Sequence, residues 1–316
     1  MKVDTLSERP KLVMGPVLFH WDAQVKLDFY ARMADEADID IVHVGEVVCS
    51  KRMPFFDKHL PDVIERLHRG GKQVVVSTLA LVMGGREAEM IRDVTAMADD
   101  MPGVLIEAND MSAAGLLAGH PHSIGPFVNI YNEGTLRHFA RRGAVRVGLP
   151  WELPMESVQI LCAHRGAVEI EMQVFGRVPL AISARCYSAR AQGLHKDGCR
   201  YVCGDHCDGM DVDTLDGEAF LAVNGLQTLS HSYLDLSGDI PALQQAGVGV
   251  FRLSPHSFDM VTIAGLYRQV IDGKITSEDL QDRLFDLCGD IDLANGFLHG
   301  KPGAIFDELP DRARGE

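Results

Sequence analysis

The chain of 316 residues, 46% of them hydrophobic, is long enough to bury a sizeable core without disulfides. Its 45 acidic and 30 basic residues give a formal net charge of −15, which argues against a nucleic-acid partner because it repels phosphate backbones. The N-terminal sequence MKVDTLSERPKL is interrupted by charges, and the longest apolar region, residues 74–84, is too short to cross a bilayer. We therefore expect a cytoplasmic location and no membrane span.

Short β-rich runs alternate along the chain with longer amphipathic segments. Runs such as Val74-Val75-Val76 are apolar throughout, which is typical of strands buried on both faces. The predicted strands cover residues 11–18, 39–46, 73–80, 103–108, 126–131, 144–149, 168–175 and 247–253. The predicted helices cover residues 22–37, 55–69, 86–99, 134–142, 154–165, 257–272 and 277–288.

Eight strands alternating with helices predict an α/β fold, a (β/α)₈ TIM-like barrel. A doubly wound sheet is the second possibility, although no Gly-x-Gly-x-x-Gly follows the first strand. We expect a single barrel domain over residues 1–316. The regular spacing fails only between strands seven and eight, where residues 176–246 form an insertion several times longer than a normal crossover. The polar tail, residues 307–316, is expected to fray.

Three of the seven cysteines fall in the insertion as a C-x₃-C-x₃-C pattern, Cys199, Cys203 and Cys207. Thiolates are soft ligands that suit iron–sulfur clusters or zinc. Two thiols four residues apart would lie on one face of a helical turn. The spacing differs from the paired C-x-x-C of a zinc ribbon, and the surrounding segment is too polar for buried free thiols.

Two further cysteines follow predicted strands. Cys49 comes just after strand two and Cys186 just after strand seven, so both should lie at the C-terminal face of the barrel, where active sites gather. They can therefore meet the insertion in space. Cationic residues flank each of them and would favour the thiolate form, namely Lys51, Arg52, Arg185 and Arg190. Lys51 and Arg52 could equally be parts of a solvated loop.

The remaining two cysteines, Cys162 and Cys288, sit on apolar helix faces and are expected to be packed core thiols. Several polar residues follow or line predicted strands. Glu169 and Glu171 should share the inner side of strand seven, and Asn129 and Tyr131 one face of strand five, while Glu152 follows strand six. Such carboxylates act either as acid–base groups or as partners of buried arginines, and the sequence leaves both open.

A resemblance to a known family extends from about residue 12 to about residue 290. The segments that carry it are GEVVCSKR (45–52), STLALV (77–82), IEAND (106–110), NIYN (129–132), SARCYSAR (183–190), VNGLQTLS (223–230) and FRLSP (251–255). They resemble the collagenase-like peptidase family, and within it the UbiU/UbiV branch, in particular the UbiV type, whose members act in ubiquinone biosynthesis. GEVVCSKR, SARCYSAR and the C-x₃-C together are specific to that branch.

The resemblance implies both a cofactor and a function. It implies a [4Fe-4S] cluster on Cys49, Cys186, Cys199 and Cys203, with Cys207 as an extra thiol. It also implies an iron–sulfur subunit of an oxygen-independent system that hydroxylates a ubiquinone precursor under anaerobic conditions. The implied partners are a UbiU-like protein, which forms a heterodimer with the chain, and a UbiT-like lipid carrier protein. The resemblance implies no catalytic residue.

Two other functions stay open. A zinc- or cluster-stabilised barrel could serve only as a binding scaffold, with four thiolates in a closed site. A collagenase-like peptidase is the other, although the sequence contains neither H-E-x-x-H nor Gly-x-Ser-x-Gly.

Overall fold

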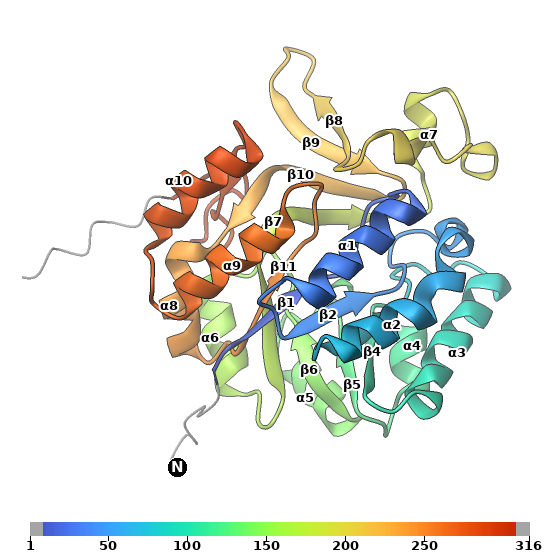
Figure 1. Cartoon of the computed structure of the whole chain (residues 1–316), viewed down its shortest axis with the longest axis horizontal. Coiled ribbons are helices and arrows are strands. Elements are labelled where there is room, and N and C mark those ends of the chain that lie inside the picture. Colours follow the sequence, from blue (N-terminus) through green and yellow to red (C-terminus); the bar gives the residue numbers. More distant parts are fainter. Residues whose placement is uncertain (1–8, 308–316) are drawn as a thin grey trace, which may run out of the picture.

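The computed structural model describes residues 9–307, and a closed barrel of eight parallel strands lies at its centre (Figure 1). Neighbouring strands pair in chain order, and the last barrel strand pairs with both the first and the seventh, which closes the ring. The barrel strands are β1 (Lys11–Met14), β2 (Ile41–Val44), β3 (Gln73–Ser77), β4 (Val104–Ala108), β5 (His122–Ile124), β6 (Ala144–Gly148), β7 (Glu169–Ile182) and β11 (Val250–Leu253). The predicted (β/α)₈ fold is confirmed.

Helices surround the barrel. They are α1 (Ala23–Asp35), α2 (Leu60–Arg69), α3 (Gly85–Asp100), α4 (Met111–Leu116), α5 (Glu133–Arg141), α6 (Met155–Ala163), α8 (Ile240–Ala246), α9 (Met260–Ile271) and α10 (Ser277–Cys288). Local chemistry sets their starts, since the Asp22 carboxylate accepts the Gln24 N–H at 2.8 Å and Thr276 forms a capping box with Asp279. All seven predicted helices form, whereas α4 and α8 were not predicted, being short and weakly patterned.

The fifth barrel strand was predicted in the wrong place. Residues 126–131 were expected to form it, but the strand is β5, only three residues long and just upstream. Pro126 opens a short 3₁₀ helix, and Asn129 has a left-handed backbone with φ of 61°. Asn129 and Tyr131 therefore do not share a strand face. Tyr131 instead donates a hydrogen bond to the Glu152 carboxylate at the surface.

The seventh strand is longer than predicted and belongs to two sheets. Its first part pairs with β6 and β11 in the barrel, and its second part pairs antiparallel with β10 (Gln227–Asp235). Between the two parts stands Gly176, with φ of +106°. The strands β9 (Ala219–Asn224) and β8 (Met210–Asp213) continue the antiparallel pairing as a hairpin that projects from the barrel (Figure 1). The short strand β12 (Leu293–Ala294) pairs with the later part of β10, on the same edge as β9 and opposite β7.

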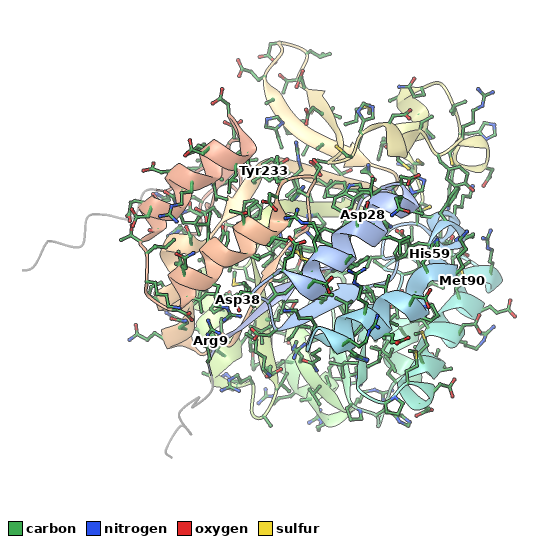
Figure 2. The ribbon with its side chains drawn as sticks, in the orientation of Figure 1. Arg9, Asp28, Asp38, His59, Met90 and Tyr233 are labelled. Atoms are coloured by element: carbon green, nitrogen blue, oxygen red, sulfur yellow. The ribbon has the colours of Figure 1, made fainter. Side chains whose placement is uncertain are left out.

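The barrel interior consists of an apolar layer beneath a charged one. Val13, Ile41, Val75 and Val250 pack together in one cluster, with Leu105 against them. Outward-facing strand residues such as Val42, Val44, Val74 and Val76 join the main core between strands and helices. Side chains fill that space in Figure 2. Arg9 and Asp38, which are labelled there, lie at the end of the barrel where the strands begin, with Arg9 Nη2 3.9 Å from Asp38 Oδ2.

Within residues 9–307, no helix has the length and apolar character needed to span a membrane. Nearly all of the predicted fraying tail, residues 308–316, lies outside the described residues, as do residues 1–8.

Candidate functional site

Four cysteines from three separate segments line one cavity, although up to 154 residues separate them in sequence (203 minus 49). They are Cys49, Cys186, Cys199 and Cys203, the four that the resemblance implies as ligands, and they are named here the four-cysteine site. A small apolar cluster that includes Leu18, Val47, Val48 and Leu226 packs beneath them. The four thiols are therefore sheltered at the C-terminal end of the barrel strands.

Cys49 is positioned by the turn after β2. The Glu46 carboxylate accepts the backbone N–H groups of Val48 and Cys49 at 3.0 and 3.1 Å, and Cys49 then caps the 3₁₀ helix Ser50–Phe55. Gly45 begins this turn with φ of +103°, and a Cβ there would fall 2.6 Å from the Ser77 carbonyl oxygen. The turn thus needs glycine at its first position.

Cys186 is held where β7 ends. It caps α7 (Tyr187–Ala191), and the Tyr187 N–H donates to the Gly225 carbonyl at 3.2 Å. The Ser188 hydroxyl in turn accepts the Gly225 N–H at 2.9 Å. These bonds fasten the Cys186 segment to the turn between β9 and β10.

Cys199 and Cys203 lie on an irregular loop, residues 196–207, named here the cysteine loop. The expected helical turn does not form between the two cysteines, because Arg200 and Tyr201 have left-handed backbones with φ of 50° and 56°. Side chains from elsewhere hold the loop instead. Lys51 Nζ donates to the Lys196 carbonyl at 2.6 Å, and Asn224 Nδ2 donates to the Cys203 carbonyl at 2.9 Å.

A buried arginine supplies positive charge to this site. Arg52 is 3% exposed, and its guanidinium donates to the Leu18 carbonyl at 3.0 Å and to Asn224 Oδ1 at 2.6 Å. Burial raises the pKa of the Cys49 and Cys203 thiols, and the Arg52 charge acts in the opposite direction. The solvated-loop alternative is therefore wrong for Arg52. Arg185 and Arg190 are exposed.

The other three cysteines lie away from the four-cysteine site. Cys207 is exposed, with its sulfur 3.6 Å from the Ser257 hydroxyl, and it lines a different pocket. Cys162 is buried in the main core and Cys288 packs against that core, as predicted for structural thiols. Burial raises the pKa of each to about 11.

A second polar cluster fills the charged layer of the barrel. Arg252 bridges the carboxylates of Glu107 and Glu171, and the Ser77 hydroxyl donates to Glu107 at 2.7 Å and lies 3.1 Å from His43 Nδ1. Burial alone would raise the pKa of Glu107, but Arg252 and His43 hold it well below its usual range. Of the two roles considered for buried carboxylates, pairing with arginine is the one seen for Glu171, and Glu169 likewise pairs with Arg146 at 2.8 Å.

This charged layer has little room for a ligand. The cavity above Glu107 and Arg252 measures about 10 Å³, enough for roughly one water molecule. His43, Glu107 and Glu171 place donor atoms within 4.8 Å of one another. The Arg252 guanidinium already pairs with both carboxylates, so we assign no metal there.

A sequence profile of peptidase family U32 matches residues 29–307. The chain belongs to this family. Because the match covers the barrel from β2 onward and the insertion, all four cysteines of the four-cysteine site lie within the matched residues. The comparison names the family and does not reach the UbiU/UbiV branch.

Two solved structures show distant similarity. A dihydropteroate synthase from Coxiella burnetii in complex with pteroic acid shares 10% identity, with 89% of this chain and 96% of that chain covered and a TM-score of 0.42. An endo-beta-mannanase/endo-beta-glucanase from Prevotella bryantii also shares 10% identity, with 75% and 41% covered and a TM-score of 0.37.

The residues around the thiols were harder to predict than the thiols themselves. Cysteine clustering and position after a strand indicated the four thiols that line this cavity, whereas Glu46, Asn224 and Gly225 belong to no general motif. Their only signal was that GEVVCSKR and VNGLQTLS carry the family resemblance.

Proposed function

We propose that this member of family U32 is the iron–sulfur subunit of an oxygen-independent hydroxylation system in ubiquinone biosynthesis, acting on a ubiquinone precursor. The observation that carries the proposal is the convergence of Cys49, Cys186, Cys199 and Cys203 on one cavity from distant segments. The similarity of GEVVCSKR and SARCYSAR to the UbiV branch is the reason for proposing ubiquinone biosynthesis as the pathway.

The spacing of the thiols favours a [4Fe-4S] cluster over a single zinc ion. Zinc–sulfur bonds of about 2.3 Å place tetrahedral sulfur ligands roughly 3.8 Å apart. Among the described residues, the three donor groups found within 4.8 Å of one another are His43, Glu107 and Glu171, not a trio of cysteines. A four-iron cluster binds each thiolate to a different iron atom and so needs wider spacing.

The chain's own residues suit such a cluster in charge and in shelter. Arg52, buried beside Cys49 and Cys203, offsets negative charge on the thiolates. Leu18, Val47 and Leu226 keep water from the inner side of the site. When bound, the cluster would supply one-electron transfer, and four cysteine ligands leave no iron open for direct substrate binding.

The proposed partners are a UbiU-like protein, as a heterodimer, and a UbiT-like lipid carrier. Exposed aromatic residues near the four-cysteine site support a protein contact there. Phe55 and Tyr201 are 45% and 38% exposed, and their rings stack edge to face with centroids 4.7 Å apart. Such amphipathic rings are enriched at protein interfaces.

Family membership favours a collagenase-like peptidase as the second candidate. Within residues 9–307, Ser77 lies beside His43 and Glu107, but this group is buried below a cavity of only about 10 Å³. The group of Ser257, Asp208 and His256 lines or adjoins a larger pocket, but its order does not match a hydrolytic triad. The Asp208 carboxylate lies between the other two, accepting from the Ser257 hydroxyl and lying 3.4 Å from His256 Nδ1. In a triad the imidazole must contact the nucleophile directly.

The deciding experiment measures iron, sulfide and visible absorption on protein purified without oxygen. Single Cys→Ala changes at Cys49, Cys186, Cys199 or Cys203 should each remove most of the iron, because a cluster normally needs all four ligands. Cys162→Ala, Cys207→Ala and Cys288→Ala are the matched controls and should retain it. A colourless protein that contains zinc, or iron lost with Cys207→Ala but kept with Cys203→Ala, would contradict the proposal.

A further inference from the structure

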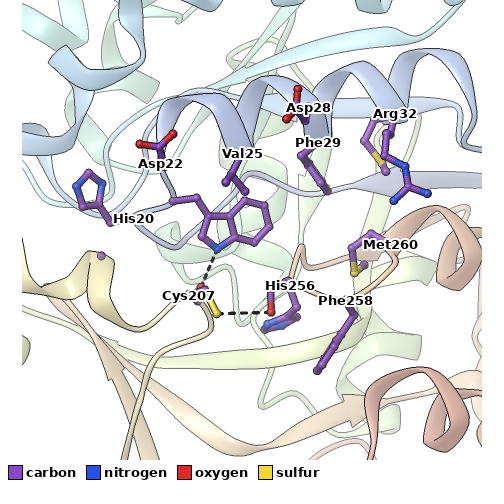
Figure 3. Close-up of a pocket in the computed structure, with 14 residues that line it drawn as sticks. His20, Asp22, Val25, Asp28, Phe29, Arg32, Cys207, His256, Phe258 and Met260 are labelled. Atoms are coloured by element: carbon purple, nitrogen blue, oxygen red, sulfur yellow. Dashed lines mark hydrogen bonds between the residues drawn. The ribbon is translucent and has the colours of Figure 1, made fainter.

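A pocket of about 400 Å³ lies on the other side of the cysteine loop from the four-cysteine site (Figure 3). That volume is in the range of small-molecule sites. It is bounded by the start of α1, by the residues that follow β11 and by the cysteine loop. It contrasts with the cavity of about 10 Å³ inside the barrel mouth, which cannot hold a substrate.

Aromatic rings form two facing walls of this pocket, which is named here the aromatic pocket. Trp21 and Phe29 lie on the α1 side, with ring centroids 5.4 Å apart, and His256 and Phe258 lie on the opposite side (Figure 3). Flat side chains on two sides favour a flat guest, because aromatic rings pack best in stacked or edge-to-face pairs.

The charged groups at the pocket are engaged with protein partners. Arg32 pairs with Asp259 at 2.9 Å, and the Asp22 carboxylate caps α1. The Trp21 indole N–H donates to the Cys207 carbonyl at 2.7 Å. An anionic ligand would therefore have to break the Arg32–Asp259 pair and would also meet the carboxylates of Asp22 and Asp28, whereas an uncharged ligand would not be repelled.

One buried polar group in the wall is left incompletely bonded. His256 is 1% exposed, and its Nε2 accepts the Arg177 N–H at 3.0 Å, so the ring hydrogen is on Nδ1. Nδ1 has no aligned hydrogen-bond partner, and the Asp208 carboxylate is 3.4 Å away. The Asp208 carboxylate is its nearest acceptor, and a ligand oxygen that reaches Nδ1 would compete with that carboxylate.

The cysteine loop closes the pocket with Gly204 and Cys207. Gly204 follows Cys203 directly, and a Cβ on Gly204 would lie 3.2 Å from His20 Cδ2, so this wall is tight. A ring held in the pocket therefore lies against the same loop that carries Cys199 and Cys203.

We propose that the aromatic pocket binds the ring of an uncharged, alkyl-substituted phenol, with the hydroxyl toward His256. Binding follows from the pocket alone. Only the further step, that this ring is the one hydroxylated by the system, rests on the proposed function.

The test uses the intact cluster-loaded protein and para-propylphenol as the probe. The chain has two tryptophans, so in a Trp151→Phe variant Trp21 alone reports on the pocket. We expect saturable quenching of its fluorescence, and several-fold slower alkylation of the exposed Cys207 by iodoacetamide. Phe258→Ala should weaken binding roughly tenfold. Phe220→Ala, an exposed ring on β9, should leave binding unchanged.

Two outcomes would overturn the pocket assignment, namely absence of saturable quenching or equal protection of Cys207 by propanol, which lacks a ring. The Cys49→Ala variant separates the two proposals. Phenol binding that persists in this variant supports a pocket independent of the cluster, whereas iron-loaded protein that binds no phenol contradicts the pocket and leaves the proposed cluster intact.

Discussion

At the scale of single residues, the four-cysteine site depends on one buried cation and the groups that hold it. Arg52 contacts Leu18 and Asn224, and Asn224 also holds the backbone of Cys203. Gly225, next in the chain, has φ of +69°, and a Cβ there would fall 2.3 Å from Arg52 Nη2. The turn and the cation therefore constrain each other.

A Gly225→Ala change should damage the site. The methyl group must displace the Arg52 guanidinium, and a left-handed alanine adds roughly 1–3 kcal/mol of strain. We expect a lower melting temperature and loss of most bound iron, measured by calorimetry and iron analysis. Gly217→Ala is the matched control, since φ there is +86° but nothing lies within 4 Å. It should cost about 1 kcal/mol and retain iron; equal iron in both variants would disprove the coupling.

Sequence patterns indicated which cysteines come together better than they indicated the residues that hold those cysteines in place. A thiol has few roles in a polar loop, so Cys199 and Cys203 stood out, whereas Asn224 in a β turn is ordinary. The separate location of Cys207 could not be predicted from even spacing. It follows from the extended backbone of His206, with φ of −130°, which ends the short 3₁₀ helix Val202–Asp205 just before Cys207.

At the scale of elements, long buried strands were predicted well and short or shared ones poorly. The run Val74-Val75-Val76 identified β3, because a strand covered on both faces is apolar throughout. β5 has only three residues, so the β-branched and aromatic residues after Pro126 gave a stronger signal than the strand itself. The extension of β7 past Gly176 depends on pairing with β10, which no local pattern reveals.

The charged layer connects β2, β4, β7 and β11, and its contribution to the free energy of unfolding should depend on pH. Arg252→Met would leave the carboxylates of Glu107 and Glu171 buried without their cation, at a cost of roughly 3–5 kcal/mol near neutral pH. The Arg252 charge holds the pKa of Glu107 low, so this carboxylate contributes stability above its unfolded pKa that is lost only in strong acid. Without Arg252, burial dominates and raises that pKa, so protonation should favour the folded variant.

Urea unfolding at two pH values tests this. The free energy of unfolding of Arg252→Met should fall short of that of the native chain by less at pH about 5 than at pH about 8, because Glu107 in the variant takes up a proton on folding. Arg9→Met is the matched control, since Arg9 pairs with Asp272 at the surface and should contribute below about 1 kcal/mol. A deficit that does not change with pH would contradict the assigned pairing.

At the scale of the whole molecule, an acidic chain presents exposed aromatic residues beside its four-cysteine site. The proposed heterodimer should use such apolar contacts and should therefore survive moderate salt. Light scattering after size exclusion of the co-expressed chains should give the mass of one copy of each. Phe55→Glu should dissociate the pair, whereas Phe220→Glu on the β9 hairpin should not. A particle of this chain alone that fully hydroxylates a quinone precursor would overturn the two-subunit arrangement.

The pairing of β7 with β10 has an evolutionary consequence. Ile182 and Gln227 are direct cross-strand neighbours, so the two ends of the segment 183–226 lie next to each other at the end of the β7–β10 pair. That segment contains Cys186, Cys199 and Cys203, whereas the barrel supplies only Cys49. One genetic insertion at a hairpin turn could thus have added three of the four thiols of the four-cysteine site without any change in barrel topology. On this account the cysteine-bearing segment and the barrel have separable histories, and the hydrogen bond from Arg52, buried in the loop after β2, to Asn224 is where the two parts now depend on each other.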